Sequence, residues 1–393
     1  MRVDRWLLPE GVDEALPDVA WRLERARAKL LGVYRAWGYE LIRPPFIEYL
    51  DSLLTGAGSA LDLQTFKFAD QLSGRMLGIR SDITTQAARI DAHRLRREGA
   101  ARYCYIGSVL RTVPDGLGGT RAPLQVGAEL FGHAGVASDF EVLALMLETL
   151  TALGIAEVHL DLGHVGIYRA LSAKLGLGAD VEQELFDILQ RKSRPDLAAF
   201  MAARPRDAQL SEWLNALILL NGDLSVLPRA RQQLAAAGAE VTQALDTLEA
   251  LVKRLRERYP AVPIHIDLAE LRGYRYKTGV VFAAFVSGQG RELARGGRYD
   301  GVGAAFGRAR AATGFSADLN QLITLAQLPE EGVAAPVFAP AVEDAALAAK
   351  IAELRGQGRR VVQALGQETA ASLACQDELV KDGKDWKLRS VKA

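Results

Sequence analysis

The sequence predicts a mixed α+β protein built on a largely antiparallel sheet, and three observations support this fold class. Strand-like runs alternate with segments of helical periodicity over residues 18–327. A block of helical segments interrupts the strands at about residues 167–258. A Pro- and Ala-rich stretch, EEGVAAPVFAPA, begins at Glu330 and is typical of a linker. We therefore predict a main domain over residues 1–329 and a small C-terminal α/β unit over residues 330–393, too short to bury a large core alone.

Composition excludes several classes of protein. Of the 393 residues, 49% are hydrophobic and 24% charged, which is ordinary for a globular protein. The 48 Lys and Arg balance the 48 Asp and Glu, so net charge gives no sign of a dedicated nucleic-acid binder. Two cysteines are too few for a disulfide framework and favour a reducing, cytoplasmic compartment. No apolar run reaches the ~18 residues of a membrane span, and no signal peptide or metal-ligand motif is present.

The first predicted element is a helix over residues 18–37, because its apolar side chains recur at helical spacing. Gly38 stands where a C-terminal cap is expected. The following run, YELIRPPFIEY, contains Pro44 and Pro45, which lack a backbone donor, so it belongs at the edge of a sheet.

Residues 60–165 are predicted to be mainly strands with one helix. The strand-like runs are TFKFAD, RMLGIRSD, RYCYIGSVLR, PLQVGAELFG and AEVHLDLG. A helix is expected over residues 138–153, because Ser138 and Asp139 are suited to begin it.

After the helical block, strands are predicted at VPIHIDLAEL, TGVVFAAFVSG and RGGRYDGV. Residues 313–327 indicate a strand that turns into a helix. Beyond the linker we expect one helix over residues 344–355 and one strand, RRVVQAL. The final KDGKDWKLRSVK is interpreted as solvated charge.

Polar residues gather at the ends of the predicted strands. They are Arg80 to Thr84, Arg111, Gln125 with Glu129, and Arg272 with Tyr274 and Tyr276. Gln125 and Glu129 interrupt an otherwise apolar strand, and burying them is unfavourable unless they are paired. Together with Asp82 and an arginine they form a candidate cage for the charged ends of an amino acid. Internal ion pairs between strands are the alternative, which the joint occurrence of these residues disfavours.

A glycine run at residues 115–121, DGLGGTR, has two interpretations. Its amides suit a phosphate, and its composition suits a flexible hairpin turn. Neither of the common phosphate-loop patterns occurs in the chain.

The stretch VLRTVPDGLGGTRAPLQVGAELFG resembles motif 2 of class II aminoacyl-tRNA synthetases, specifically that of histidyl-tRNA synthetase. GYELIRPP is similar to motif 1 with Pro45 at its proline, and IRSDIT, LRGYRYKTGVVF and ARGGRYDG are similar to segments of the histidine pocket. The resemblance implies a class II synthetase-like sheet flanked by helices. It also implies a histidine-binding set consisting of Asp82, Thr84, Gln125, Glu129, Arg272, Tyr276 and Tyr299.

The sequence differs from the synthetase in motifs 2 and 3, which bind ATP in that family. The family's motif 3 ends in a Glu-Arg pair, and this chain has Asn320 and Gln321 there. A neutral amide cannot replace a guanidinium on a triphosphate, where each charge-assisted hydrogen bond contributes roughly 1.5–3 kcal/mol. Motif 2 has Val113 in place of an acidic residue. Arg111, Arg121 and Gln321 are therefore predicted to mark a vestigial nucleotide site.

Two positions of the histidine-specific segment also differ. Lys277 stands where a second aromatic hydroxyl is expected, and Gly279 where the family has arginine. The C-terminal unit is smaller than the anticodon-binding domain of a histidyl-tRNA synthetase.

The combination resembles the synthetase-like regulatory subunits of ATP phosphoribosyltransferase. That resemblance implies a chain without catalytic residues, cofactor or metal, in which histidine is the effector. It implies a homodimer that assembles with a short-form catalytic subunit for the first step of histidine biosynthesis, with histidine feedback and with neither membrane nor tRNA as partner. An active histidyl-tRNA synthetase and a tRNA-binding paralogue are the alternatives.

Overall fold

The computed structural model describes residues 6–56, 59–114, 116, 119–203, 208–274, 276–328 and 335–391. The chain divides into two compact units, Met1–Gln327 and Leu328–Ala393, which are treated separately below. None of the described helices combines the length and the apolar character needed to cross a bilayer.

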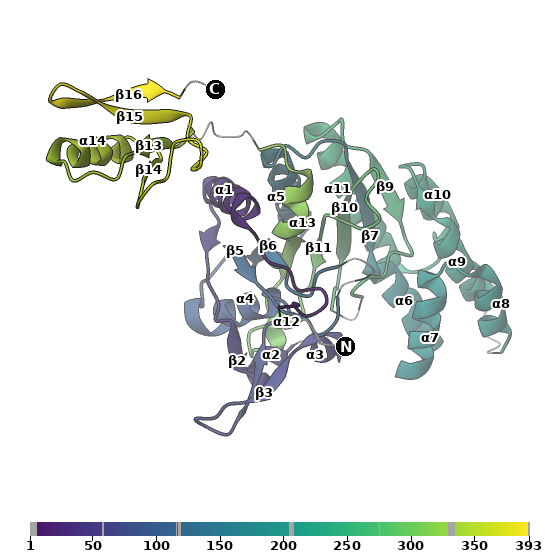
Figure 1. Cartoon of the computed structure of the whole chain (residues 1–393). Helices are drawn as coiled ribbons and strands as arrows, with labels where there is room; N and C mark the ends of the chain where they lie inside the picture. Colours follow the sequence, from purple (N-terminus) through teal and green to yellow (C-terminus); the bar gives the residue numbers. More distant parts are fainter. Residues whose placement is uncertain are drawn as a thin grey trace, which may run out of the picture. The chain divides into compact units, whose positions relative to one another are not determined.

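A nine-stranded sheet forms the centre of the first unit (Figure 1). In spatial order its described strands are β1 (Glu40–Leu41), β5 (Ala101–Ser108), β6 (Leu124–Phe131), β12 (Ala312–Asp318), β11 (Ala294–Arg298), β10 (Val280–Val286), β7 (Val158–His164), β9 (Ile264–Asp267) and β8 (Asn221–Gly222). In this spatial order, every neighbouring pair from β5 through β6, β12, β11 and β10 to β7 is antiparallel. The pairs β1–β5 and β7–β9 are parallel. The predicted, largely antiparallel α+β fold is confirmed.

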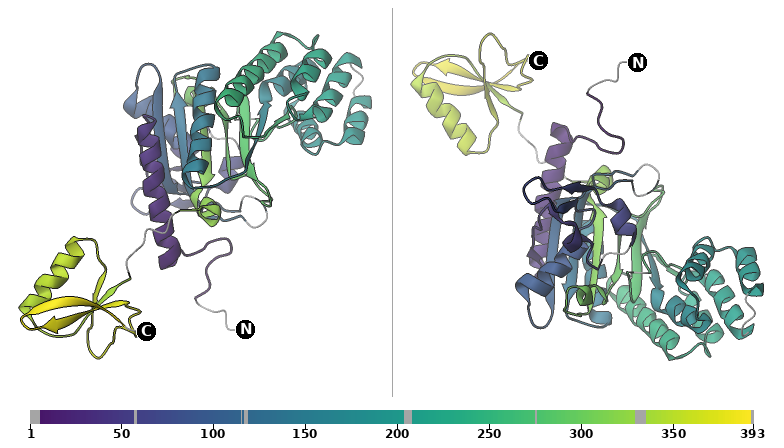
Figure 2. Two further views of the ribbon diagram at one scale, coloured as in Figure 1. Left: turned by 90° about the horizontal axis from the view of Figure 1, so that it is seen from above. Right: turned by 90° about the horizontal axis from the view of Figure 1, so that it is seen from below.

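Helices cover one face of this sheet. α5 (Val136–Ala152) packs across β6, β12, β11 and β10, with α1 (Pro17–Ala36) and α11 (Ala239–Arg258) beside it and α13 (Leu319–Leu325) against α1 (Figure 2). α1 lies where the periodicity predicts it, because Leu23, Ala26, Leu30 and Tyr34 form its buried stripe. Gly38 follows it with φ of 80°, a conformation that favours glycine.

The start of α5 differs from the sequence prediction. The helix begins at Val136 after Gly135, two residues before the predicted Ser138. Ser138 and Asp139 bind Arg298 of β11 instead, so their polarity serves the packing of the helix on the sheet and not its cap.

A small antiparallel sheet and several short helices lie by the other face. The strands are β2 (Ile47–Tyr49), β4 (Met76–Ile79) and β3 (Lys67–Ala69), and the helices are α2 (Leu50–Leu54), α3 (Ser59–Gln64), α4 (Thr84–Ile90), the π-helix η1 (Asp91–Leu95) and α12 (Val302–Ala305). α4 packs with α12, and its Ala87 and Ala88 share a buried cluster with Phe131 and Tyr299.

The helical block extends from the β7–β9–β8 end of the sheet (Figure 1). It contains α6 (Val165–Leu175), α7 (Ala179–Gln190), α8 (Arg194–Ala202), α9 (Ala208–Leu219) and α10 (Val226–Gln233) before α11. The prediction that this block is entirely helical is wrong, because it contains the edge strand β8. Asn221 and Gly222 of β8 pair with Asp267 and Ile266.

The second unit is a four-stranded sheet with one helix. Its elements are β13 (Val337–Ala339), α14 (Ala345–Gly356), β14 (Val361–Gln363), β15 (Asp377–Asp382) and β16 (Asp385–Ser390). The prediction of a solvated tail is wrong here, because β15 and β16 form a hairpin. The residues predicted to be a linker also contribute β13, which pairs with β14 and β15.

Candidate functional site

Strand β6 and the residues at the start of helix α4 bring four of the predicted pocket residues together. Gln125 and Glu129 lie on β6 at positions of the same parity, so their side chains share a face of the sheet. β6 pairs with β5 on one side and with β12 on the other. Glu129 therefore lies opposite Tyr103 of β5 and Gly314 of β12. Asp82 and Thr84 lie at the start of α4, by the same face.

Asp82 and Gln125 form the outer part of this cluster. The Gln125 amide donates to Asp82 Oδ2 at 2.8 Å, and its Oε1 accepts the amide of Ile83 at 2.9 Å. Asp82 Oδ1 accepts the amide of Thr84 at 2.7 Å. These bonds fix the carboxylate at the end of β6, where it can meet a cationic group.

Glu129 forms the buried part of the cluster. Its Oε1 accepts the Tyr105 hydroxyl at 2.9 Å, and its Oε2 accepts the Tyr299 hydroxyl. Burial raises the pKa of Glu129 to about 8, against the opposing effect of the two tyrosine hydrogen bonds. Burial thus favours the neutral form of this carboxyl, and the two hydroxyl donors favour the ionised form.

Tyr276 stacks on Tyr299, with ring centroids 5.1 Å apart and an angle of 26° between the planes. Its hydroxyl is buried and has no hydrogen-bond partner within the described part of the chain. The Lys277 ammonium donates to the carbonyl oxygen of Gly296, and burial lowers the pKa of this lysine to about 7. The two tyrosines predicted to flank an imidazole therefore lie against each other, and one of their hydroxyls is unsatisfied.

Arg272, predicted to pair with a ligand carboxylate, is already paired with two carboxylates. Its Nη2 lies 2.8 Å from Glu270 Oε2, and its Nη1 lies 3.0 Å from Glu292 Oε2. A ligand carboxylate would have to exchange with one of these partners.

The three residues of the predicted vestigial nucleotide site are not all together. Arg111 and Gln321 line one cavity, and Arg121 is not among its lining residues. The Arg121 guanidinium donates to the carbonyl oxygens of Arg111 at 3.1 Å and Glu10 at 3.2 Å, and it lies over the Phe66 ring. Arg121 therefore holds the N-terminal segment against the motif 2 region. The Gln321 amide donates to the Glu292 carbonyl oxygen at 3.3 Å.

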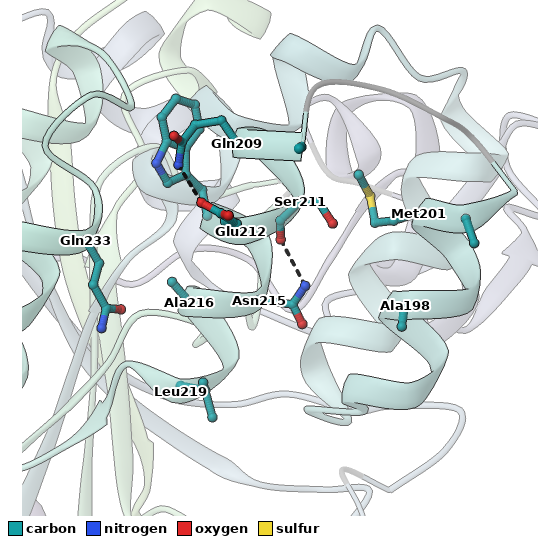
Figure 3. Close-up of a pocket in the computed structure, with 12 residues that line it drawn as sticks. Ala198, Met201, Gln209, Ser211, Glu212, Asn215, Ala216, Leu219 and Gln233 are labelled. Atoms are coloured by element: carbon teal, nitrogen blue, oxygen red, sulfur yellow. Dashed lines mark hydrogen bonds between the residues drawn. The ribbon is translucent and has the colours of Figure 1, made fainter.

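The cavity that adjoins these residues has a volume of about 290 Å³. Gln125 and Arg272 also line it, so it borders the predicted histidine pocket. A larger hollow of about 870 Å³ lies in the helical block between α8, α9 and α10 (Figure 3). It contains none of the predicted site residues, and the carboxylate there, Glu212, accepts the Gln209 amide at 3.0 Å.

Sequence reasoning missed three contributors to the buried cluster. Tyr105 donates a hydrogen bond to Glu129, and a strand-interior tyrosine gives no signal of that role. Gly314 leaves room for the Glu129 carboxylate, because a Cβ built there would overlap it. Gly127 similarly leaves room for the Tyr105 hydroxyl, 2.6 Å from where its Cβ would be. Among the described residues, no group of three or more His, Cys, Asp or Glu side chains could hold a metal ion.

Comparisons with known proteins match this architecture. A family model described as histidyl-tRNA synthetase matches residues 11–322, and one for the C-terminal domain of ATP phosphoribosyltransferase subunit HisZ matches residues 334–389. An ATP phosphoribosyltransferase regulatory subunit from Thioalkalivibrio sulfidiphilus is 55% identical over 97% of this chain and 97% of its own length. One from Methylococcus capsulatus is 54% identical over 98% of this chain and 95% of its own length.

Solved structures agree in fold. An ATP phosphoribosyltransferase regulatory subunit/histidyl-tRNA synthetase from Bacillus halodurans is similar with a TM-score of 0.82 and 26% identity, covering 95% of this chain and 97% of that chain. The histidyl-tRNA synthetase of Nostoc, at 18% identity, has a TM-score of 0.75 over 95% of this chain and 91% of that chain. The second likeness concerns the fold alone.

Proposed function

The chain belongs to the family of ATP phosphoribosyltransferase regulatory subunits, and from this premise we propose that it catalyses no reaction itself and assembles with a short-form catalytic subunit. The family places it in histidine biosynthesis. The partner would then join ATP to phosphoribosyl pyrophosphate, the first step of that pathway.

One observation above all supports a non-catalytic role. The guanidinium expected from motif 3 is absent, because position 321 is a glutamine. Arg121 of motif 2 binds the carbonyl oxygens of Glu10 and Arg111, so Arg111 is the one residue of the three that brings a guanidinium to the cavity. Without those charge-assisted hydrogen bonds, a nucleotide's phosphates lack the contacts that activation needs.

Histidine is the effector we propose, held in the pocket around β6. Asp82, Gln125 and Glu129 would take its ammonium group, and Tyr276 and Tyr299 would flank its ring. The fixed Asp82 carboxylate, the stacked tyrosines and the unsatisfied Tyr276 hydroxyl support this assignment. A coupling free energy of ~1–3 kcal/mol between this pocket and the catalytic subunit would suffice for feedback inhibition.

A homodimer formed through the motif 1 region completes the proposal. Leu41, Phe46 and Ile47 are between 44% and 51% exposed, although they lie at the edge of the main sheet and on the small sheet beside it. Exposed apolar side chains that follow one another along a chain segment support an interface there.

The experiment that tests the function combines the purified chain with a short-form catalytic subunit and measures transferase activity. We expect activity well above that of the catalytic subunit alone, and inhibition by histidine. The same chain, assayed alone for histidine-dependent ATP–pyrophosphate exchange, should be inactive. Exchange above background would contradict the non-catalytic assignment and favour an active synthetase.

A further inference from the structure

Two glycines on neighbouring strands form the floor of the pocket beside Glu129. Gly314 of β12 lies opposite Glu129 of β6, and Gly297 of β11 lies opposite Gly314. Directly opposed residues of antiparallel strands project to the same face of a sheet, so the two glycines leave adjoining spaces on the pocket face. The Glu129 carboxylate fills the first space, because a Cβ built at Gly314 would overlap it.

Lys277 fills the second space. A Cβ built at Gly297 would lie 3.0 Å from both the Cδ and the Nζ atoms of Lys277. The turn that carries the lysine is held by its own backbone, because the Lys277 amide donates to the Gly273 carbonyl oxygen at 2.8 Å. The ammonium donates to the carbonyl oxygen of Gly296. It therefore lies on the same face of the sheet as the Glu129 carboxylate, over the neighbouring strand.

The Lys277 ammonium has N–H donors that the protein does not use. An ammonium carries three donors, and within the described part of the chain one of them binds Gly296 and none forms an ion pair. Charges of both signs act on it from nearby, those of Arg295, Arg272, Glu270 and Glu129. Enclosed donors without acceptors are unfavourable. The free donors therefore favour a ligand that brings an acceptor to this end of the pocket.

The neighbouring side chains indicate the kind of acceptor. Tyr276 stacks on Tyr299 next to the lysine, so aromatic surface lies beside the ammonium, and a flat ring suits such surroundings. An uncharged imidazole has one N–H donor and one unprotonated nitrogen that accepts. An imidazolium has donors only, and it would meet the Lys277 ammonium with like charge.

We propose that Lys277 is the specificity-determining residue of the effector pocket, and that it donates a hydrogen bond to the unprotonated ring nitrogen of an uncharged histidine side chain. The assignment rests on the histidine pocket proposed above, and it adds which residue recognises the ring and which form of the ring is bound. A ring without an acceptor nitrogen leaves the donors of Lys277 unmet, which disfavours other aromatic amino acids.

The contact does not require the charged form of the lysine. Burial lowers the pKa of Lys277 to about 7, and the amine that remains after loss of the proton still carries N–H donors. The decisive property is therefore the hydrogen bond, which ring analogues of histidine can test without titrating the ring.

The test is calorimetry on the full-length chain assembled with the short-form catalytic subunit. The ligands are the two thiazolylalanines, whose uncharged rings place one acceptor nitrogen either next to the side-chain carbon or remote from it, and thienylalanine, whose ring has no nitrogen. We expect one thiazolylalanine to bind at least about tenfold more tightly than thienylalanine. In Lys277→Met, whose unbranched side chain still covers Gly297 but has no donor, the two affinities should become about equal.

Two further variants locate the donor, with circular dichroism as the check that each is folded. Lys253→Met changes an exposed lysine of α11 and should keep the wild-type ratio of the two affinities. The Tyr276 hydroxyl is the competing donor, because it also lacks a partner within the described residues. Collapse of the ratio in Tyr276→Phe and not in Lys277→Met would assign the contact to the tyrosine and overturn the proposal.

The remaining outcomes separate this assignment from the function on which it rests. A ratio near one in the wild type, or a ratio that Lys277→Met leaves unchanged, would overturn the role of Lys277 even if histidine binds. Failure of histidine itself to bind the wild-type complex would overturn the pocket and this role together. The transferase assay described above reports separately on the regulatory function.

Discussion

The raised pKa of the Glu129 carboxyl determines how the pocket should respond to a cationic ligand. Burial raises the pKa of the carboxyl to about 8, while Tyr105 and Tyr299 donate to it. A neutral acid attracts a cation weakly. An arriving ammonium group favours the ionised form, so binding would draw the proton off.

Stability should depend on pH through this residue. The folded-state pKa of about 8 exceeds the ordinary 4.5, so the folded state binds more protons between these values and becomes less stable as pH rises through them. Wild type should therefore lose more than about 1 kcal/mol relative to Glu129→Gln between pH 5 and pH 8. Urea denaturation of both proteins across this range measures the difference. A difference independent of pH would show that Glu129 is ionised throughout.

Histidine binding to the assembled complex should release a proton near pH 7.5. Calorimetry in two buffers of different ionisation enthalpy counts the protons, and Glu129→Gln is the control because the ligand's own imidazole titrates nearby. We expect the variant to release fewer protons and to bind at least about tenfold more weakly. Equal affinity and equal proton release in both proteins would place the effector elsewhere.

The sequence anticipated some of these residues and not others. Gln125 and Glu129 could be predicted to have polar partners, because a polar residue inside a buried strand needs one whatever the tertiary details, and Asp82 was inferred from the resemblance of IRSDIT. Arg121 lies elsewhere because its long side chain follows the N-terminal segment, 111 residues away along the chain. Gly314 gives no local signal, since its role exists only once β12 lies beside β6.

A buried ion pair between helix α5 and strand β11 stabilises the packing of α5 on the sheet. Arg298 of β11 lies 2.9 Å from Asp139 of α5, and the two side chains are only 9% and 2% exposed. The same guanidinium donates to the Ser138 hydroxyl at 2.8 Å. The two residues expected to begin the helix therefore fix its position on the strands.

Asp139→Ala should destabilise the main unit by roughly 1.5–3 kcal/mol, because it removes the buried carboxylate partner of Arg298 and leaves only Asp300, 3.0 Å from the guanidinium. The control is Glu98→Ala, which breaks the exposed pair with Arg308 and should change stability by less than about 1 kcal/mol. Chemical denaturation followed by circular dichroism measures both. Equal effects of the two substitutions would mean that the buried pair contributes no more than a surface one.

Local signals predicted the long elements well and the short strands poorly. The 3.6-residue periodicity of residues 18–37 depends only on neighbouring residues, and α1 follows it. β8 and β13, with two and three residues, form because a neighbouring strand offers hydrogen bonds to them. The hairpin of β15 and β16 did carry a signal: its two-residue loop is Gly383–Lys384, and Gly383, with φ of 66°, is the residue type favoured at the first loop position.

For the whole molecule, the division into two units with separate cores has a thermodynamic consequence. The buried residues of the second unit form their own cluster between α14 and its sheet. A unit below about 70–80 residues rarely gains more than about 3–5 kcal/mol from a single core. Trp386 belongs to that cluster, is 8% exposed, and has the Lys381 ammonium over its ring.

Trp386→Ala should therefore unfold the second unit while leaving the first intact. Removal of a buried tryptophan costs about 3–5 kcal/mol, which equals the whole stability expected of so small a unit. Hydrogen exchange read by mass spectrometry should lose protection over residues 335–391 and keep it over β5, β6 and β12. Trp21→Ala, at a 69% exposed position on α1, should change neither region. Loss of protection in the main sheet of the Trp386 variant would mean that the two units fold as one cooperative body.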